Sequence, residues 1–142
     1  MPGLYVVGDL TGIPLLKFSS DTGARAVQTI VADAEFGKRG DGGGAAADGG
    51  VVDLVIIGAG VSGMAAALEA KKHGLRFEIL EASELFSTIV NFPKGKPIYT
   101  YPTGMTPAGD LQFRAKVKED LVDELYAQTQ KAGIQPRFSR AV

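Results

Sequence analysis

The sequence predicts an α/β fold built on a parallel β-sheet, and three neighbouring segments support this prediction. The nearly continuous apolar run Val52–Ile57 is typical of a strand that is buried on both faces of a parallel sheet. An alanine-rich segment at 61–73 follows with helical character, and Gly74 suits the position just beyond a helix C-terminus. The segment Arg76–Leu80 then has the composition of a second strand. Together they predict a βαβ unit.

Composition narrows the range of functions. The chain has 142 residues, of which 45% are hydrophobic and 22% charged, as expected for one globular domain. The net charge of -1 gives no support to nucleic-acid binding, which needs a basic face. The sequence contains no cysteine, so a thiolate nucleophile and a cysteine-based metal site are excluded. His73 is the only histidine and is expected in the last turn of a helix, so we predict neither catalytic residues nor a metal site in this chain.

Targeting signals are not recognised in the sequence. The N-terminus lacks a basic segment followed by an apolar core, so no signal peptide is predicted. The longest uncharged run, Leu54–Leu68, is too short to span a membrane and contains three glycines. We therefore expect a cytoplasmic protein without membrane association.

The N-terminal segment 1–36 is expected to contain one strand and one helix. Leu4–Val7 is short and apolar and is closed by Gly8, as is typical of a buried strand. After the turn Thr-Gly-Ile-Pro, apolar residues recur at helical spacing, and Ser20 or Asp21 is a candidate N-cap. The helical positions are Ala24, Val27, Ile30 and Val31.

The rest of the chain divides into a linker and a larger domain. Half of the residues in 37–50 are glycine, which predicts a flexible linker. The domain at 51–142 is expected to be an incomplete Rossmann-like fold that is truncated at its C-terminal end. Its proline-rich part after Ser83 predicts a long irregular loop. An amphipathic helix should follow from Val117 to about Gly133, and a strand-like segment should begin at Ile134.

The strongest chemical signal is the GxGxxG motif that Gly58, Gly60 and Gly63 form between the first strand and the helix. Gly58 permits the tight turn, Gly60 allows a pyrophosphate to approach the backbone, and Gly63 lets the helix lie close to the sheet. The helix N-terminus then points unpaired N–H groups at the diphosphate. Ser62 adds a hydroxyl donor beside them.

An acidic residue completes this dinucleotide-binding pattern. Glu81 ends the second strand, 18 residues after Gly63, where a carboxylate accepts hydrogen bonds from the ribose hydroxyls of an adenosine. It would repel the 2′-phosphate of NADP, and no arginine follows at Ala82 or Ser83. The residues themselves therefore predict FAD or NAD, without deciding between the two.

The stretch "VIIGAGVSGMAAALEAKKHGLRFEILEA" resembles the N-terminal FAD-binding segment of the two-dinucleotide-binding-domain flavoproteins, particularly thioredoxin-reductase-like enzymes. Ala67 matches an alanine that recurs in that family four residues after the third glycine. The resemblance implies that FAD is the cofactor. The residues it places at the adenosine diphosphate are Gly58, Ala59, Gly60, Val61, Ser62, Gly63, Glu81 and Ala82.

The N-terminal stretch "GLYVVGD" resembles the second FAD motif of the same family. In that motif the strand-end aspartate binds the ribitol chain of FAD, and Gly8 and Asp9 occupy the matching positions. The resemblance implies that Thr11–Leu16 lies near the flavin ring. Considered alone, the motif also fits a strand that ends in an aspartate capping a turn.

A third stretch, "FSTIVNFPKGKPIYTYPTGMTPAGDLQF", loosely resembles the segment that follows the ribose-binding strand in bacillithiol-disulfide-reductase-like flavoproteins. The resemblance implies that Thr88 and Asn91 face the cofactor. Packing within a loop explains both residues equally well.

The chain departs from this family in three ways. It has no redox dithiol, and Ser62 stands where the bacillithiol-type enzymes carry a cysteine. It has no second GxGxxG, so no NAD(P)H domain is visible. Finally, the Gly-Asp motif precedes the GxGxxG instead of following it. Either 1–36 is the tail of an upstream flavin module, or the domain is circularly permuted. Permutation predicts that Leu4–Val7 pairs in parallel with Val52–Ile57 and that Asp9 lies near Gly60.

These interpretations lead to one functional hypothesis and two alternatives. The chain is expected to be the FAD-binding portion of a pyridine-nucleotide-dependent flavoprotein oxidoreductase, with NAD(P)H as a co-substrate that binds through a region outside this chain. It is further expected to act as a homodimer or as part of a longer chain. The alternatives are a non-catalytic NAD-binding or sensing module and an α/β scaffold without a ligand.

Overall fold

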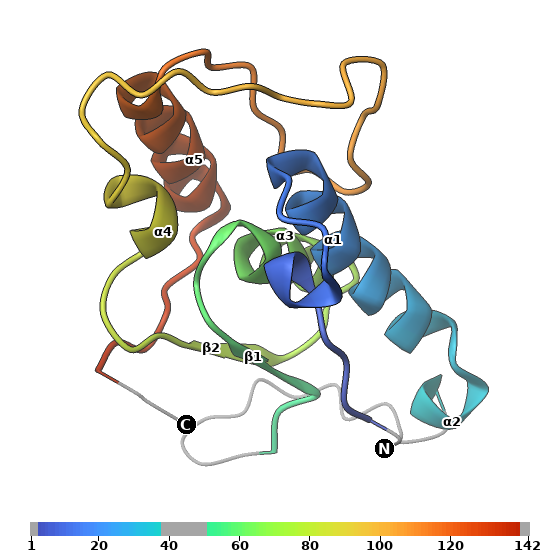
Figure 1. Ribbon diagram of the computed structural model, residues 1–142. Coiled ribbons are helices and arrows are strands. Elements are labelled where there is room, and N and C mark those ends of the chain that lie inside the picture. The colour runs from blue at the N-terminus through green and yellow to red at the C-terminus, as the bar shows by residue number, and fades with distance from the viewer. Residues whose placement is uncertain (1–2, 38–50, 140–142) are drawn as a thin grey trace.

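The computed structural model describes residues 3–37 and 51–139 (Figure 1). The predicted linker 37–50 lies outside the described residues except for Gly37. The elements, in chain order, are the 3-10 helix η1 (Gly8–Thr11), α1 (Leu16–Ala32), α2 (Ala34–Gly37), β1 (Leu54–Ile57), α3 (Val61–Lys72), β2 (Phe77–Leu80), α4 (Ser87–Val90) and α5 (Lys118–Ala132). The predicted α/β fold is confirmed, and within the described residues the parallel sheet contains two strands.

The βαβ unit forms where the sequence predicts it. β1 and β2 pair in parallel, with Leu54 opposite Phe77 and Ile57 opposite Leu80. Each strand is four residues long, so Val52 and Arg76 lie just outside the ladder. Helix α3 connects the strands and ends as expected, because His73 is its C-cap and Gly74 adopts the left-handed φ of 71° that favours glycine.

Helix α3 packs closely on β1 because its inner face carries small residues. A Cβ atom added to Gly63 would overlap the carbonyl oxygen of Gly58, so the first turn of α3 touches the backbone of the turn before it. The role predicted for Gly63 in helix packing is consistent with this contact. The small residues buried along α3 are Ala65, Ala66, Ala67 and Ala70.

Helix α1 lies against α3 (Figure 1). The two helices approach closely at Gly23, where an added Cβ would overlap the carbonyl oxygen of Ser62. Ala24 and Val27 are fully buried beside this contact. The N-terminal segment is therefore docked on the βαβ unit through α1.

The helix cap predicted at Ser20 or Asp21 is wrong. Helix α1 begins one turn earlier, at Leu16, and its N-cap Leu15 makes no side-chain cap. Ser20 and Asp21 are buried inside the helix, where they bind the long loop instead of the helix terminus. Ser20 Oγ donates to the carbonyl of Leu111 (3.2 Å).

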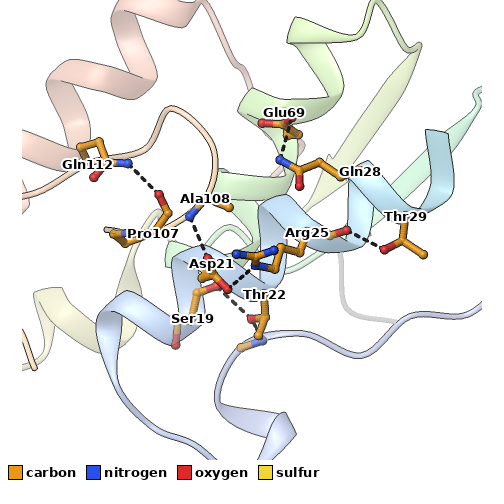
Figure 2. A network of polar contacts seen from close by, with 11 residues as sticks. Ser19, Asp21, Thr22, Arg25, Gln28, Thr29, Glu69, Pro107, Ala108 and Gln112 are labelled. Carbon is orange, nitrogen blue, oxygen red and sulfur yellow. Dashed lines mark hydrogen bonds and ion pairs between the residues drawn. The ribbon is translucent and has the colours of Figure 1, made fainter. Parts of the chain in front are cut away.

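Polar contacts hold α1 to the long loop and to α3 (Figure 2). The Asp21 carboxylate accepts a hydrogen bond from the N–H of Ala108 (2.8 Å) and pairs with Arg25 (2.7 Å). Gln28 donates to Glu69 on α3 at 3.3 Å. Because Ala108 and Glu69 are distant from α1 in the sequence, the contacts of Asp21 and Gln28 hold the helix to the loop and to α3.

The predicted pairing of Leu4–Val7 with β1 is wrong. These residues form no strand, and among the described residues β1 forms a ladder with β2 alone. Leu4 and Val6 are 62% and 58% exposed. The physical reason is that packing of α1 on α3 positions the segment, and a cavity lies between its residues and β1. The two segments therefore face each other across a space instead of sharing a ladder.

The remaining chain is mostly irregular up to α5, as predicted. The irregular part contains the four-residue helix α4. Helix α5 buries Leu121 and Leu125 completely and ends at Gly133 in the left-handed conformation. The strand-like segment expected from Ile134 is reduced to a single parallel bridge between Arg137 and Leu80. In the part of the chain that the structure describes, no helix is long and apolar enough to cross a membrane.

The contact at Gly23 gives a stability prediction. Gly23→Ala should destabilise the fold by about 1–3 kcal/mol through overpacking against Ser62, although alanine is the better helix former. Gly104→Ala is the matched control, because an added Cβ there meets open space. Urea unfolding of both variants measures the difference. Equal stability of Gly23→Ala and the unsubstituted chain would contradict the proposed closeness of α1 and α3.

Candidate functional site

The GxGxxG turn lies at the carboxyl end of β1. Gly58 has a φ of 96°, a left-handed conformation that a side chain would strain, and its N–H donates to the carbonyl of Leu80 (2.8 Å). Ala59 is completely buried, and its carbonyl accepts from the N–H of Phe86 (2.9 Å). These bonds hold the turn between β1 and the segment after β2.

The end of the turn leaves room for an anion at the start of α3. Gly60 is the N-cap, has extended φ and ψ, and provides no side chain to cap the helix. A Cβ added to it would meet open space, and Gly60 lines a cavity. The N–H groups of the first turn of α3 therefore face a space that a pyrophosphate can enter, with the positive end of the helix dipole behind them. The residues present fit the diphosphate of a dinucleotide.

Glu81 is buried beside this turn. Its Oε2 atom accepts from the N–H of Ala59 (2.7 Å), and Oε1 accepts from the N–H of Ser83 (3.0 Å). Burial acts to raise the pKa of this carboxyl, but hydrogen bonds from Ala59, Ser83 and Ala82 outweigh it and hold the pKa below the usual glutamate value. Glu81 is thus an ordered carboxylate whose two oxygens accept hydrogen bonds from the backbone around the turn.

The Gly-Asp turn lies next to the GxGxxG turn. Gly8 has a φ of 75°, and a Cβ added to it would lie 2.6 Å from Ser62 Oγ. Asp9 is exposed in the first turn of η1. The predicted neighbourhood of Asp9 and Gly60 is consistent with the structure, because both residues line one cavity of about 560 Å³.

Polar and apolar side chains both line this cavity. The polar ones include Asp9, Ser19, Ser62 and Thr88, and Leu4–Val7 and β1 contribute apolar ones. Thr88 is thus among the residues that line the cavity. Asn91 is exposed and is not among the residues that line the cavity, and Ala82 is exposed as well.

Sequence reasoning missed the aromatic residues that close one side of the site. Phe86 is buried at 1% exposure with a φ of 54°, and it lines the cavity together with Phe92. The left-handed backbone at Phe86 lets its N–H reach Ala59, which places the ring beside the phosphate-binding turn. The motif pattern does not include this position, and no local signal in the sequence marks it.

The described residues contain no group of three or more histidine or acidic side chains that could hold a metal ion. His73 instead contacts Glu69 of its own helix, with Nε2 3.0 Å from Oε1. The expected position of His73 in the last turn of a helix is consistent with this contact at the C-cap of α3.

Part of the chain is similar to known FAD-binding proteins. Residues 53–96 match the family model of the FAD binding domain. The resemblance to FAD-dependent pyridine nucleotide oxidoreductases is confirmed. A dihydrolipoyl dehydrogenase from Synechocystis sp. is 59% identical over 39 residues, which is 28% of this chain and 8% of that protein.

The fold has a matching solved structure. The bacillithiol disulfide reductase from Staphylococcus aureus superimposes with a TM-score of 0.50 at 17% identity, covering 61% of this chain and 28% of the reductase. This likeness shows the partial Rossmann-like fold. The chain therefore spans less than a third of the reductase, and its match to the dehydrogenase covers about a twelfth of that protein.

The hydrogen bonds of Glu81 give a pH prediction. Glu81→Gln should lower the stability of the folded chain by roughly 1–3 kcal/mol at neutral pH, because the amide nitrogen leaves one buried N–H donor without an acceptor. Since folding lowers the pKa of Glu81, its contribution is complete above the usual value of about 4.3 and disappears as the pH falls through the folded value.

Urea unfolding of both proteins over this pH range tests the effect. The stability difference should shrink on acidification, since protonated Glu81 also loses acceptor capacity. A difference that stays constant down to about pH 3, well below the usual glutamate pKa, would show that ionised Glu81 does not organise the turn.

Proposed function

We propose that the chain is the FAD-binding portion of an NAD(P)H-dependent flavoprotein oxidoreductase, and that both sequence motifs serve one FAD. The GxGxxG turn binds the pyrophosphate, Glu81 binds the adenosine ribose, and Asp9 binds the ribitol. The observation that carries this proposal is the single cavity lined by Asp9, Gly60 and Ser62. Two separate flavin modules would not need these motifs to lie side by side.

The contacts among these groups support the assignment. Glu81 and the start of α3 flank Ala59, so an adenosine ribose and a pyrophosphate can be held close together. Asp9 follows Gly8, which lies against the side chain of Ser62 in the first turn of α3. The ribitol follows the pyrophosphate in FAD, so a residue that binds the ribitol is needed close to this turn.

The redox chemistry in this proposal belongs to the cofactor. Bound FAD would accept a hydride from NAD(P)H and pass electrons on, whereas the residues of this chain bind and orient it. The described residues contain no thiol, in keeping with a role in cofactor binding. We propose that the region that binds NAD(P)H and the electron acceptor lies outside this chain, on a longer polypeptide or a partner subunit.

Cofactor preference is the first test. The purified chain should be yellow, or become so with added FAD, and calorimetry should show tighter binding of FAD than of NAD. Tighter binding is expected because Asp9 adds contacts to the flavin half of the molecule. A colourless chain that binds NAD and not FAD would support the sensing module instead, and a chain that binds neither would support a scaffold.

Gly60→Ala tests the position of the pyrophosphate. Alanine adopts the extended backbone of Gly60 without strain, and its methyl group meets no protein atom, so thermal stability should not change. The methyl would occupy the space of the pyrophosphate and raise the Kd for FAD roughly tenfold, or about 1.4 kcal/mol. Gly104→Ala, also in open space, should leave both properties unchanged. Unaltered FAD binding by Gly60→Ala would contradict the assigned site.

A further inference from the structure

We propose that Ser19 and Thr22 of α1 are positioning residues that hold Asp9 in the orientation needed for the ribitol of FAD. This inference rests on the proposed function and adds two residues that belong to neither sequence motif. Three steps carry it: the hydrogen bonds of the Gly-Asp turn, the orientation of the two hydroxyls on α1, and the contact between the turn and Ser62.

The Gly-Asp turn is held by side chains of α1. Ser19 Oγ donates to Asp9 Oδ1 at 2.7 Å, and the N–H of Gly8 donates to Thr22 Oγ1 at 3.0 Å. Thr11 Oγ1 in turn donates to the carbonyl of Gly8 at 2.8 Å. The N–H and the carbonyl of Gly8 and one carboxylate oxygen of Asp9 are therefore held by residues that lie outside the segment Leu4–Val7.

The second oxygen of Asp9 remains available. Among the described residues, Asp9 Oδ2 has no hydrogen-bond partner, and the residue lines the cavity. Ser19 itself is buried at 6% exposure, so its hydroxyl is held in place by its surroundings. A carboxylate anchored through one oxygen loses less conformational entropy when the other accepts a hydroxyl of a ligand.

The hydroxyls of α1 differ in how they are used. Serine and threonine hydroxyls inside a helix usually bind a carbonyl one turn back in the same helix, as Thr29 does with Arg25 (2.9 Å). Ser19 instead donates out of the helix to Asp9. Thr22 donates to the carbonyl of Ser19 (3.2 Å) and accepts from Gly8, so it joins the helix to the turn (Figure 2 shows its contact with Ser19).

Ser62 connects this turn to the phosphate-binding turn. Its side chain contacts Gly8, and its carbonyl contacts Gly23, one residue beyond Thr22. The helix that carries Ser19 and Thr22 is therefore fixed on the first turn of α3. The distance from Asp9 to the pyrophosphate position is set by rigid packing and not by the exposed segment Leu4–Val7.

Two variants and a matched control test the inference. Ser19→Ala and Thr22→Val remove one hydroxyl each, and Thr29→Val removes a hydroxyl of the same helix that does not reach the turn. The Kd values for FAD and for ADP are measured by calorimetry, because ADP contains the adenosine diphosphate half alone. The two variants should raise the Kd for FAD roughly three- to tenfold and leave the Kd for ADP unchanged. Thr29→Val should change neither.

An Asp9→Ala background shows whether Ser19 acts through Asp9. Adding Ser19→Ala to Asp9→Ala should cause no further loss of FAD affinity, because the partner is already gone. The inference is overturned if Ser19→Ala leaves FAD affinity intact, if FAD and ADP affinities fall equally, or if the two substitutions add in full. A parent chain that binds ADP but not FAD, or neither, overturns the proposed function and the inference together. If the parent chain binds FAD but the variants do not change its affinity as expected, only the inference is overturned.

Discussion

The arrangement of the site depends on close contact around Ser62. Its hydroxyl lies against Gly8, its carbonyl against Gly23, and the next residue, Gly63, touches the backbone of Gly58. A Cβ atom at Gly23 or Gly63 would overlap a backbone oxygen, so glycine lets these backbones meet where any other residue would separate them, and a Cβ atom at Gly8 would meet the Ser62 side chain. Because tightly packed groups resist displacement, the start of α3, the Gly-Asp turn and α1 behave as one unit. The proposed FAD site is built on that unit.

This packing explains how two motifs in reversed order can serve one cavity. Contacts in space, and not chain order, determine which residues line a site, and the free-energy cost of a longer connection grows only slowly with its length. The helix α1 contributes the larger part of the attachment through its apolar face and through Asp21 and Gln28. The extended segment Leu4–Val7 is attached through that helix and needs no ladder of its own.

Sequence reasoning succeeded where the local backbone conformation or the local apolar pattern determines the residue type. The glycines of the turn, Gly74 at the helix end and the two strands of the βαβ unit follow from backbone conformation and apolar pattern. It failed where tertiary contacts decide. Ser20 and Asp21 look like caps, but buried partners in the loop outcompete the helix terminus. The partner of Leu4–Val7 and the left-handed backbone of Phe86 likewise depend on segments that are distant in the sequence.

The site combines two carboxylates that are held by hydrogen bonds with helix N–H groups that have no cap. Both carboxylates are fixed before a ligand arrives, Glu81 by backbone N–H groups and Asp9 by Ser19. The N–H groups at the start of α3, in contrast, have no side-chain acceptor, because the N-cap residue is Gly60. Fixed acceptors suit the hydroxyls of ribose and ribitol, and uncapped donors suit a diphosphate. A site with one charge pattern throughout could not satisfy both, so this division of donors and acceptors is the strongest physical reason to expect a dinucleotide here.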